Sequence, residues 1–307
     1  MIHSLLIPFK GFVIGSSMTV PGVSGGTMAI LLGIYDRLIA AISHFGSNVK
    51  KNTWFLLKFC FGAVVGFLAL ASTIGWLLET YSIPTSCFFI GAIVGGIPAL
   101  YRKASESRFT ALSVLYMLIG AAVVLAIGFL KAPQPEQAEE AQMVAQALTW
   151  ADVPLWLVSG LVISLALVLP GISTSHMLLL LGIYMPMTAS IKHVFAWVKS
   201  LLGGEPVSGV MDDVLFLGML ALSTLVGVFL ITRPLEWLMK KFPHQTYCVI
   251  IGFVIGSLAD VFKGYILPSI GADRTVGAWV LMVVISVVAL IAGAAGILYL
   301  SRFSEDE

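Results

Sequence analysis

The chain has 307 residues, of which 59% are hydrophobic and 11% charged, and its mean hydropathy is +1.00. This composition excludes an ordinary soluble domain and indicates a polytopic membrane protein. The net charge of +1, without a long basic run, gives no sign of nucleic-acid binding.

The chain is expected to begin with two short apolar pieces, at about 5 to 20 and 27 to 43, separated by a break at Pro21. At a rise of about 1.5 Å per residue, each piece is about 25 Å long, short of a hydrocarbon core of about 30 Å. They are predicted to be the arms of a re-entrant hairpin or a broken helix. The N-terminus has neither a basic segment nor a small-residue cleavage pattern, so no cleaved signal peptide is expected.

Longer apolar runs follow, and the same plan then returns in the second half of the chain. The expected runs are 54–78, 84–101 and 110–130, and then 154–169, 171–191, 214–232, 246–262 and 277–300. Each half therefore has three long spans and one pair of short pieces.

The two halves are copies of one unit. The segments PGVSGGTMAILLGIYDRLIAAI (21–42) and PGISTSHMLLLLGIYMPMTASI (170–191) are identical at 11 of 22 positions. The match continues through 66–78 against 227–239 and through 87–96 against 248–257. We predict a first copy at 1–131, an outward-facing linker at 132–150 and a second copy at 151–307, which form one integral membrane domain.

Each copy crosses the membrane an odd number of times, whether its short pair adds no crossing or two. The second copy must then be upside down relative to the first, and the predicted fold is an all-α polytopic membrane protein with an inverted-topology repeat. The positive-inside rule places one group of basic residues, and both termini, in the cytoplasm. This group comprises Lys50, Lys51, Arg102, Lys103, Arg108, Arg233, Lys240, Lys241 and Arg302, and the opposite group comprises Lys131, Lys192, Lys199, Lys263 and Arg274.

Small and hydroxyl residues surround both breaks. Irregular backbone at membrane depth is tolerated only where protein buries it or it lines a cavity, so the breaks mark a candidate site. A helix start with free N–H groups and hydroxyls suits an anion such as phosphate, although Ser and Thr could merely cap the helix. The candidate binding residues are Ser24, Gly25, Gly26 and Thr27 in the first copy and Ser173, Thr174, Ser175 and His176 in the second, with Pro21, Gly22, Pro170 and Gly171 as hinges.

Two charged residues, Asp36 and Arg37, follow the first break only. Arg37 is a candidate counter-charge for an anionic headgroup, and Asp36 is its candidate orienting partner or a protonation switch. An interfacial pair directed to the cytoplasmic surface is the alternative. His44 and His193 align just past the two hairpins and are interpreted as interfacial, while Arg233 and Glu236 are interpreted as a structural i, i+3 pair.

Other functions remain open at this level. A channel or antiporter for a small anion would use the same helix starts. Gly22-Val23-Ser24-Gly25-Gly26 also fits the G-x-S-x-G pattern, so a rhomboid-like intramembrane serine protease using Ser24 is a remote alternative. No metal-ligand cluster or cofactor motif is evident, and no cofactor is expected.

The string PGVSGGTMAILLGIYDRLI, with its echo PGISTSHMLLLLGIY, resembles the polyprenyl-phosphate transporter family, the undecaprenyl-phosphate flippases of bacterial membranes. The resemblance implies a transporter in the inner membrane, not an enzyme. It would return undecaprenyl phosphate from the outer to the cytoplasmic leaflet, to recycle the lipid carrier for cell-envelope synthesis. It also implies membrane lipids as partners and leaves the coupling ion open between a proton and sodium.

Overall fold

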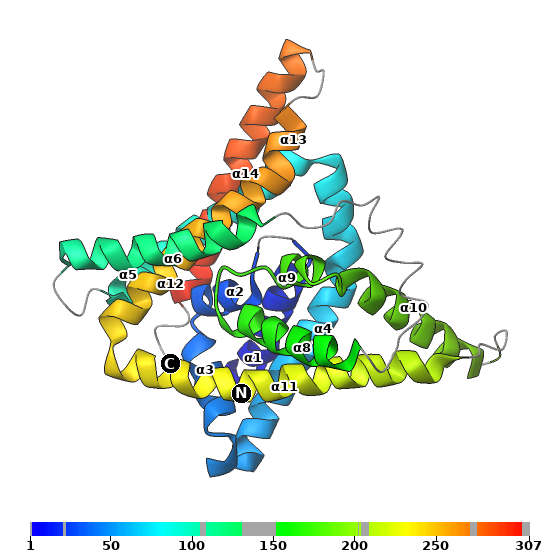
Figure 1. Cartoon of the computed structure of the whole chain (residues 1–307). Coiled ribbons are helices and arrows are strands. Elements are labelled where there is room, and N and C mark those ends of the chain that lie inside the picture. Colours follow the sequence, from blue (N-terminus) through cyan, green and yellow to red (C-terminus); the bar gives the residue numbers. More distant parts are fainter. Residues whose placement is uncertain are drawn as a thin grey trace. The chain divides into compact units, whose positions relative to one another are not determined.

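The computed structural model describes residues 2–20, 23–104, 109–130, 152–201, 203, 209–270 and 275–302. Regular structure in these ranges is helical throughout, without a strand (Figure 1). They contain six helices that are long and apolar enough to cross a membrane, or up to eight spans if each of two bent helix pairs counts as one. The prediction of an all-α polytopic membrane protein is therefore confirmed.

The helices follow the predicted runs closely. The first copy contains α1 (Ile2–Ser17), α2 (Gly25–Leu31), α3 (Tyr35–Ser43), the 3-10 helix η1 (Phe45–Ser47), α4 (Val49–Thr80), α5 (Ser82–Ala104) and α6 (Ala111–Phe129). The second copy contains α8 (Val153–Val168), α9 (Thr174–Leu180), α10 (Tyr184–Leu201), α11 (Val210–Lys241), α12 (Pro243–Val261), the π-helix η3 (Phe262–Ile266), α13 (Leu267–Ile270) and α14 (Val276–Arg302).

The second arm of each predicted hairpin contains a further bend that the sequence analysis did not place. The arm at 27–43 bends by 116° between α2 and α3, and the arm at 171–191 bends by 108° between α9 and α10. The bends lie at Gly33 and Gly182, whose φ angles are 64° and 70°. The backbone N–H groups of Gly33 and Ile34 bond to the carbonyls of Ile30 and Ala29. This is the Schellman arrangement that ends a helix at a left-handed glycine, and the second copy repeats it.

Glycine residues allow α1 and α4 to pack closely against each other. An added Cβ at Gly11, Gly15, Gly62 or Gly66 would overlap a backbone carbonyl of the partner helix, so α1 and α4 pack backbone to backbone (Figure 1). Gly62 and Gly66 have the small-xxx-small spacing that lets membrane helices approach closely.

The second copy repeats this helix contact. Gly160 of α8 lies as far before Pro170 as Gly11 lies before Pro21. An added Cβ would meet the backbone nitrogen of Thr224 at 2.8 Å for Gly160, and that of Ala63 at 3.1 Å for Gly11. The duplication is thus visible in the packing of α8 on α11 as well as in the sequence.

The later helices pair across the copies. An added Cβ at Gly91 of α5 would overlap the carbonyl oxygen of Leu290 in α14. The aligned Gly252 of α12 stands in the same relation to Met117 of α6. Half of the most apolar 18-residue window is buried in α5 and in the span at Pro243–Ile270, against 17–22% in the other four spans. α5 and α12 are therefore the inner helices, and each packs on the last span of the other copy.

The described residues form two compact units that do not coincide with the two copies. The larger unit takes its residues from Met1–Gly128, Leu169–Ser173 and Thr232–Glu307, and the smaller from Phe129–Val168 and Thr174–Ile231. The linker at 132–150 lies outside the described residues. The second break, at Leu169–Ser173, thus belongs to the same unit as the first.

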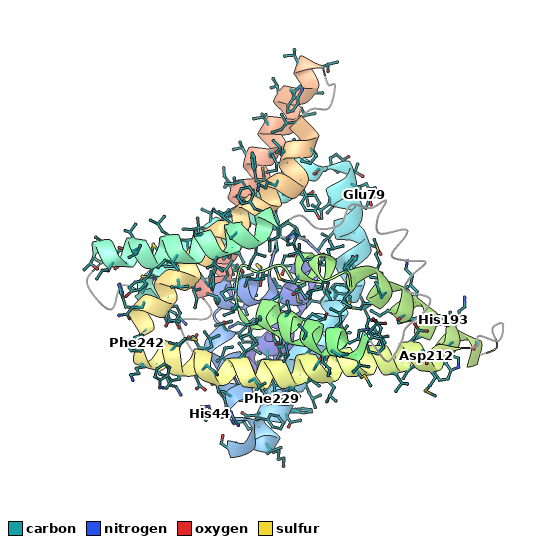
Figure 2. All side chains as sticks on the ribbon, in the orientation of Figure 1. His44, Glu79, His193, Asp212, Phe229 and Phe242 are labelled. Atoms are coloured by element: carbon teal, nitrogen blue, oxygen red, sulfur yellow. The ribbon has the colours of Figure 1, made fainter. Side chains whose placement is uncertain are left out.

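Large apolar side chains cover the outward faces of the spans (Figure 2). Phe61 of α4, Leu118 of α6, Leu222 of α11 and Val280 of α14 are each at least 60% exposed. Surfaces of this kind suit the hydrocarbon of a bilayer.

We predict that Gly62→Ala destabilises the protein by about 1–3 kcal/mol, because its Cβ overlaps the backbone of Pro8 and forces α1 away from α4. Gly75→Ala is the matched control on the same helix, where nothing lies within 4 Å of the added Cβ. Thermal unfolding in detergent measures both variants. Equal stability of the two would contradict the packing role of Gly62.

Candidate functional site

The hydroxyl groups at the end of α1 are used by the backbone. Ser17 donates to the carbonyl of Ile14 at 2.7 Å, and Thr19 donates to that of Ser16 at 2.7 Å. The Ser16 hydroxyl is within hydrogen-bond distance of two carbonyls, that of Phe12 in its own helix and, at 3.1 Å, that of Gly66 in α4. These three side chains close the end of the helix and offer no free hydroxyl to a ligand.

Ser24 differs from them. It stands immediately before α2 in extended conformation, with φ −85° and ψ 138°, yet its side chain makes no capping hydrogen bond. The residue is 5% exposed, and its Oγ has no hydrogen-bond partner among the described residues. Leaving a buried hydroxyl unpaired costs about 1–3 kcal/mol, so such a group is commonly completed by a water or a ligand. The capping alternative therefore fails at Ser24.

The two breaks touch each other within the larger unit. The backbone N–H of Gly171 donates to Oγ1 of Thr27 at 2.9 Å, and Thr27 is fully buried. Gly171 has φ +80°, and a Cβ there would overlap the carbonyl oxygen of Phe253 in α12. Only glycine fits this position, both for its backbone conformation and for the space around it.

The remaining predicted residues are divided between the units. Gly25 and Gly26 form the first turn of α2, where a Cβ on Gly25 would lie 3.0 Å from Sδ of Met18. Ser173 and Pro170 are buried in the larger unit. Thr174, Ser175 and His176 form the first turn of α9 in the smaller unit and are half-buried. Pro21 and Gly22 lie outside the described residues.

The helices after the breaks are shorter than predicted, because α2 and α9 have seven residues each. A helix of two turns aligns few peptide dipoles, so a helix dipole contributes little here. Individual hydroxyl and N–H groups, rather than a helix N-terminus, are what the breaks offer to a ligand.

Asp36 and Arg37 begin α3 and make separate contacts. Asp36 accepts a hydrogen bond from the Tyr247 hydroxyl at 3.0 Å and forms an ion pair with Lys103. The Arg37 guanidinium lies over the Phe55 ring, 4.4 Å from its centroid. In the larger unit, Asp36 therefore ties α3 to α5 and α12, while Arg37 stacks on α4.

Lys10 is a charged residue in the first apolar piece of the chain, and the structure buries it to 5% exposure. It shares one face of α1 with Ile14 and Ser17, both buried, and that face leads to the first break. An ionisable residue inside a membrane helix is by itself a signal of a functional position, and that signal was present in the sequence.

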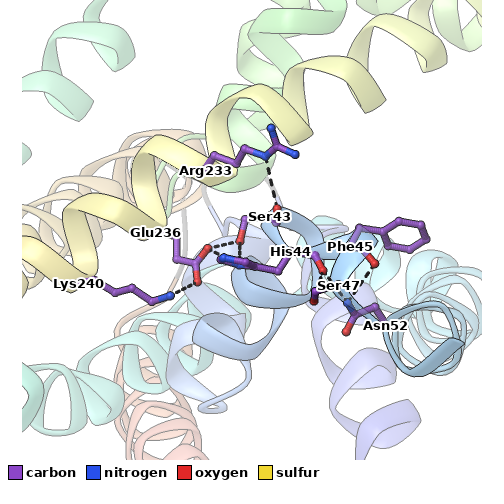
Figure 3. Close-up of polar contacts among 8 residues, drawn as sticks. All are labelled: Ser43, His44, Phe45, Ser47, Asn52, Arg233, Glu236 and Lys240. Carbon is purple, nitrogen blue, oxygen red and sulfur yellow. Dashed lines mark hydrogen bonds and ion pairs between the residues drawn. The ribbon is translucent and has the colours of Figure 1, made fainter. Parts of the chain in front are cut away.

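Glu236 is the other residue whose role the sequence did not reveal. Its carboxylate lies at the end of α3, where it contacts the hydroxyl of Ser43 and Nδ1 of His44 (Figure 3). Lys240, one turn further along α11, contacts the other carboxylate oxygen at 2.6 Å. Arg233 does not pair with Glu236 as expected, because its Nε donates to the carbonyl of Ser43 at 3.4 Å. Both residues join α11 to α3.

A serine protease needs a base within hydrogen-bond reach of its nucleophile. The Oγ of Ser24 has no such partner in the part of the chain that the structure describes. The geometry therefore gives no support to the protease alternative.

Comparison with known proteins identifies a family for the chain. Residues 14–275 match the family model described as undecaprenyl phosphate translocase-like. The chain is 28% identical over 267 residues to a polyprenyl-phosphate transporter of Vibrio cholerae, a match that covers 82% of this chain and 76% of the relative. It is also 31% identical over 257 residues to a polyprenyl-phosphate transporter of Staphylococcus aureus. This match covers 83% of this chain and 85% of the relative. No solved structure matches the chain.

These matches are to transporters, and they confirm both the family resemblance and the prediction that the chain is a membrane transporter and not an enzyme. They do not bear on which residues bind the substrate.

We predict that Thr27→Val lowers the free energy of unfolding by about 1–3 kcal/mol, because it leaves the buried N–H of Gly171 without an acceptor. Thr27→Ser keeps the acceptor oxygen and should retain most of the stability. Thermal unfolding in detergent compares the two. Equal losses in both variants would mean that the methyl group, not the hydrogen bond, is what matters.

Proposed function

The chain belongs to the undecaprenyl phosphate translocase-like family, and we propose that it moves undecaprenyl phosphate from the outer to the cytoplasmic leaflet of the bacterial inner membrane. This transport would return the lipid carrier to cell-envelope synthesis. The family description and the names of the two relatives support the polyprenyl-phosphate substrate.

One observation carries the proposed headgroup site. The buried, unpaired hydroxyl of Ser24 lies three positions before Thr27, the residue through which the first break contacts the second. A phosphate offers acceptor oxygens that this hydroxyl can donate to, and N–H groups exposed by an irregular backbone can add further donors. The proposed binding residues are Ser24, Gly25, Gly26, Thr27 and Arg37 of the first copy with Ser173, Thr174, Ser175 and His176 of the second.

The proposed mechanism is alternating access between inverted halves. Pro21, Gly22, Pro170 and Gly171 act as hinges, and rocking of the two copies exposes the headgroup to one leaflet at a time. A sideways opening to the bilayer keeps the isoprenoid tail in hydrocarbon throughout. The odd number of spans in each copy and the distribution of basic residues support this topology, with both termini in the cytoplasm.

The two copies contribute unequally in this proposal. The second copy lacks the paired glycines after its break, and it has Met185 and Pro186 where the first has Asp36 and Arg37. The first copy should therefore hold most of the phosphate charge, with Arg37 as counter-charge. Asp36 orients α3 through Lys103 and Tyr247, or takes part in coupling to a proton or sodium.

We predict that Ser24→Ala lowers the rate of undecaprenyl phosphate transport in proteoliposomes by about tenfold, as expected for loss of one hydrogen bond to a charged group. The rate can be followed by the accessibility of a radiolabelled headgroup to a phosphatase added outside. Ser86→Ala is the matched control, because Ser86 Oγ is likewise buried and unpaired but lies on α5, away from the breaks in the sequence.

Two outcomes of this assay would contradict the proposal. If Ser24→Ala transports at the rate of Ser86→Ala, the headgroup site is elsewhere. If the wild-type protein carries chloride or inorganic phosphate and leaves the lipid in place, the small-anion alternative is correct instead.

We predict that Arg37→Gln slows transport several-fold, because it removes the charge proposed to neutralise the headgroup, while Arg37→Lys retains more activity. Arg102→Gln removes a charge from the group of basic residues assigned to the cytoplasmic side and should have a smaller effect. Transport rates measured at low and high salt test this, because loss of the charge should also reduce the salt dependence. If Arg37→Gln and Arg102→Gln slow transport equally, Arg37 has no specific role at the headgroup and acts only as one of several surface charges.

A further inference from the structure

Two aligned histidines, His44 and His193, make the same kind of contact. In the larger unit, Nδ1 of His44 lies 3.0 Å from Oε2 of Glu236 (Figure 3). In the smaller unit, Nδ1 of His193 lies 2.5 Å from Oδ2 of Asp213. His44 directly follows α3, His193 lies in the middle of α10, and both carboxylates belong to α11.

The two carboxylates lie near opposite ends of this single helix. Asp213 is in the first turn of α11, which starts at Val210, and Glu236 is close to its end at Lys241. At a rise of about 1.5 Å per residue, they are about 35 Å apart along the helix, slightly more than the thickness of the hydrocarbon core. Because α11 is long and apolar enough to cross a membrane, we infer that each histidine contact lies near one of its faces.

The burial of these groups suits contacts that open. The carboxylate side chains are largely buried, at 10% exposure for Glu236 and 16% for Asp213, whereas the histidines are 58% and 40% exposed. A histidine that leaves can be hydrated at once, so a contact this exposed is weak. Lys240 stays beside Glu236 on the same helix, so this carboxylate keeps a partner when α3 moves away.

We propose that these contacts are latches. Glu236 and Asp213 act as positioning residues that hold α3 and α10, respectively, against α11. Each latch opens when the transporter gives access to its own face of the membrane. This inference rests on the proposed alternating-access function, because a protein without two access states would have no use for one latch near each face.

The sequence offers aligned reporter positions for testing each latch. Ala41 of α3 and Ser190 of α10 are equivalent in the two copies, and both are buried. In a variant with alanine at the three native cysteines, Ala41→Cys or Ser190→Cys supplies one thiol. The rate of maleimide labelling in open membrane fragments then reports the opening of one arm.

We expect Glu236→Gln to raise labelling at position 41 about fivefold, the population change produced by losing about 1 kcal/mol, and to leave position 190 unchanged. Asp213→Asn should do the reverse. His44→Ala should reproduce Glu236→Gln, and because His44 is mostly exposed, this change does not disturb the core.

Exposed carboxylates provide the controls. Asp212→Asn, next to Asp213, and Glu79→Gln, at the end of α4, make the same chemical changes at exposed positions and should alter neither reporter (Figure 2). The proposal is overturned if Glu236→Gln raises labelling at both positions alike, which indicates general loosening, or at neither.

Failure of the latches and failure of the proposed function can be told apart. Maleimide labelling needs no lipid substrate. Selective labelling in a protein that does not move undecaprenyl phosphate would support the latches and contradict the substrate, whereas normal transport with unselective labelling would do the opposite.

Discussion

The structure depends on satisfying backbone polar groups where the chain is irregular inside the membrane. No water is available in hydrocarbon to pair with such groups, so protein must supply their partners. The first break supplies one to the second, through the hydrogen bond from Gly171 N–H to Thr27 Oγ1. Neither break could be built in this form alone, because the side chain of one copy completes the backbone of the other. A binding site at this contact would therefore be formed by residues of both copies.

Close helix packing provides the rigid frame around that contact. Glycines let α1 approach α4, and equivalent glycines let α5 approach α14 and α12 approach α6. The last two pairs each join one helix of the first copy to one of the second, so the copies are interlocked and not merely adjacent. Small residues at such interfaces let the two backbones approach closely.

Hydropathy and the internal repeat predicted every long span of the described chain, because these signals are local or periodic, although α11 extends nine residues past its predicted run and α4 begins five residues before its own. The bends at Gly33 and Gly182 were missed although the sequence contains their signal, a glycine followed by an apolar residue in both GIY motifs. The contacts of Glu236 could not be predicted in this way. They join residues 193 positions apart, and no repeat marks them, because Arg233 and Glu236 replace Ser72 and Gly75 of the first copy. The unpaired hydroxyl of Ser24 likewise becomes visible only once its surroundings are known.

Several charged residues occur in only one of the two copies. Comparison of the sequences shows them only as missing from the other copy, whereas the structure shows what they contact. Asp36 exists only in the first copy, and its partner Tyr247 belongs to the second. Arg233 and Glu236 exist only in the second copy, and they contact Ser43 and His44 of the first. Each copy thus carries charged residues that contact the other copy at the ends of α3, and Asp36 is also paired with Lys103 of its own copy. A symmetric scaffold would give both hairpins the same strength of attachment. Dividing the charges instead fixes α3 by contacts at both of its ends, whereas the contact described for α10 is one histidine–aspartate pair near the middle of the helix. The described polar contacts of the two arms thus differ, and under the proposed alternating access the two arms would have different free energies of release.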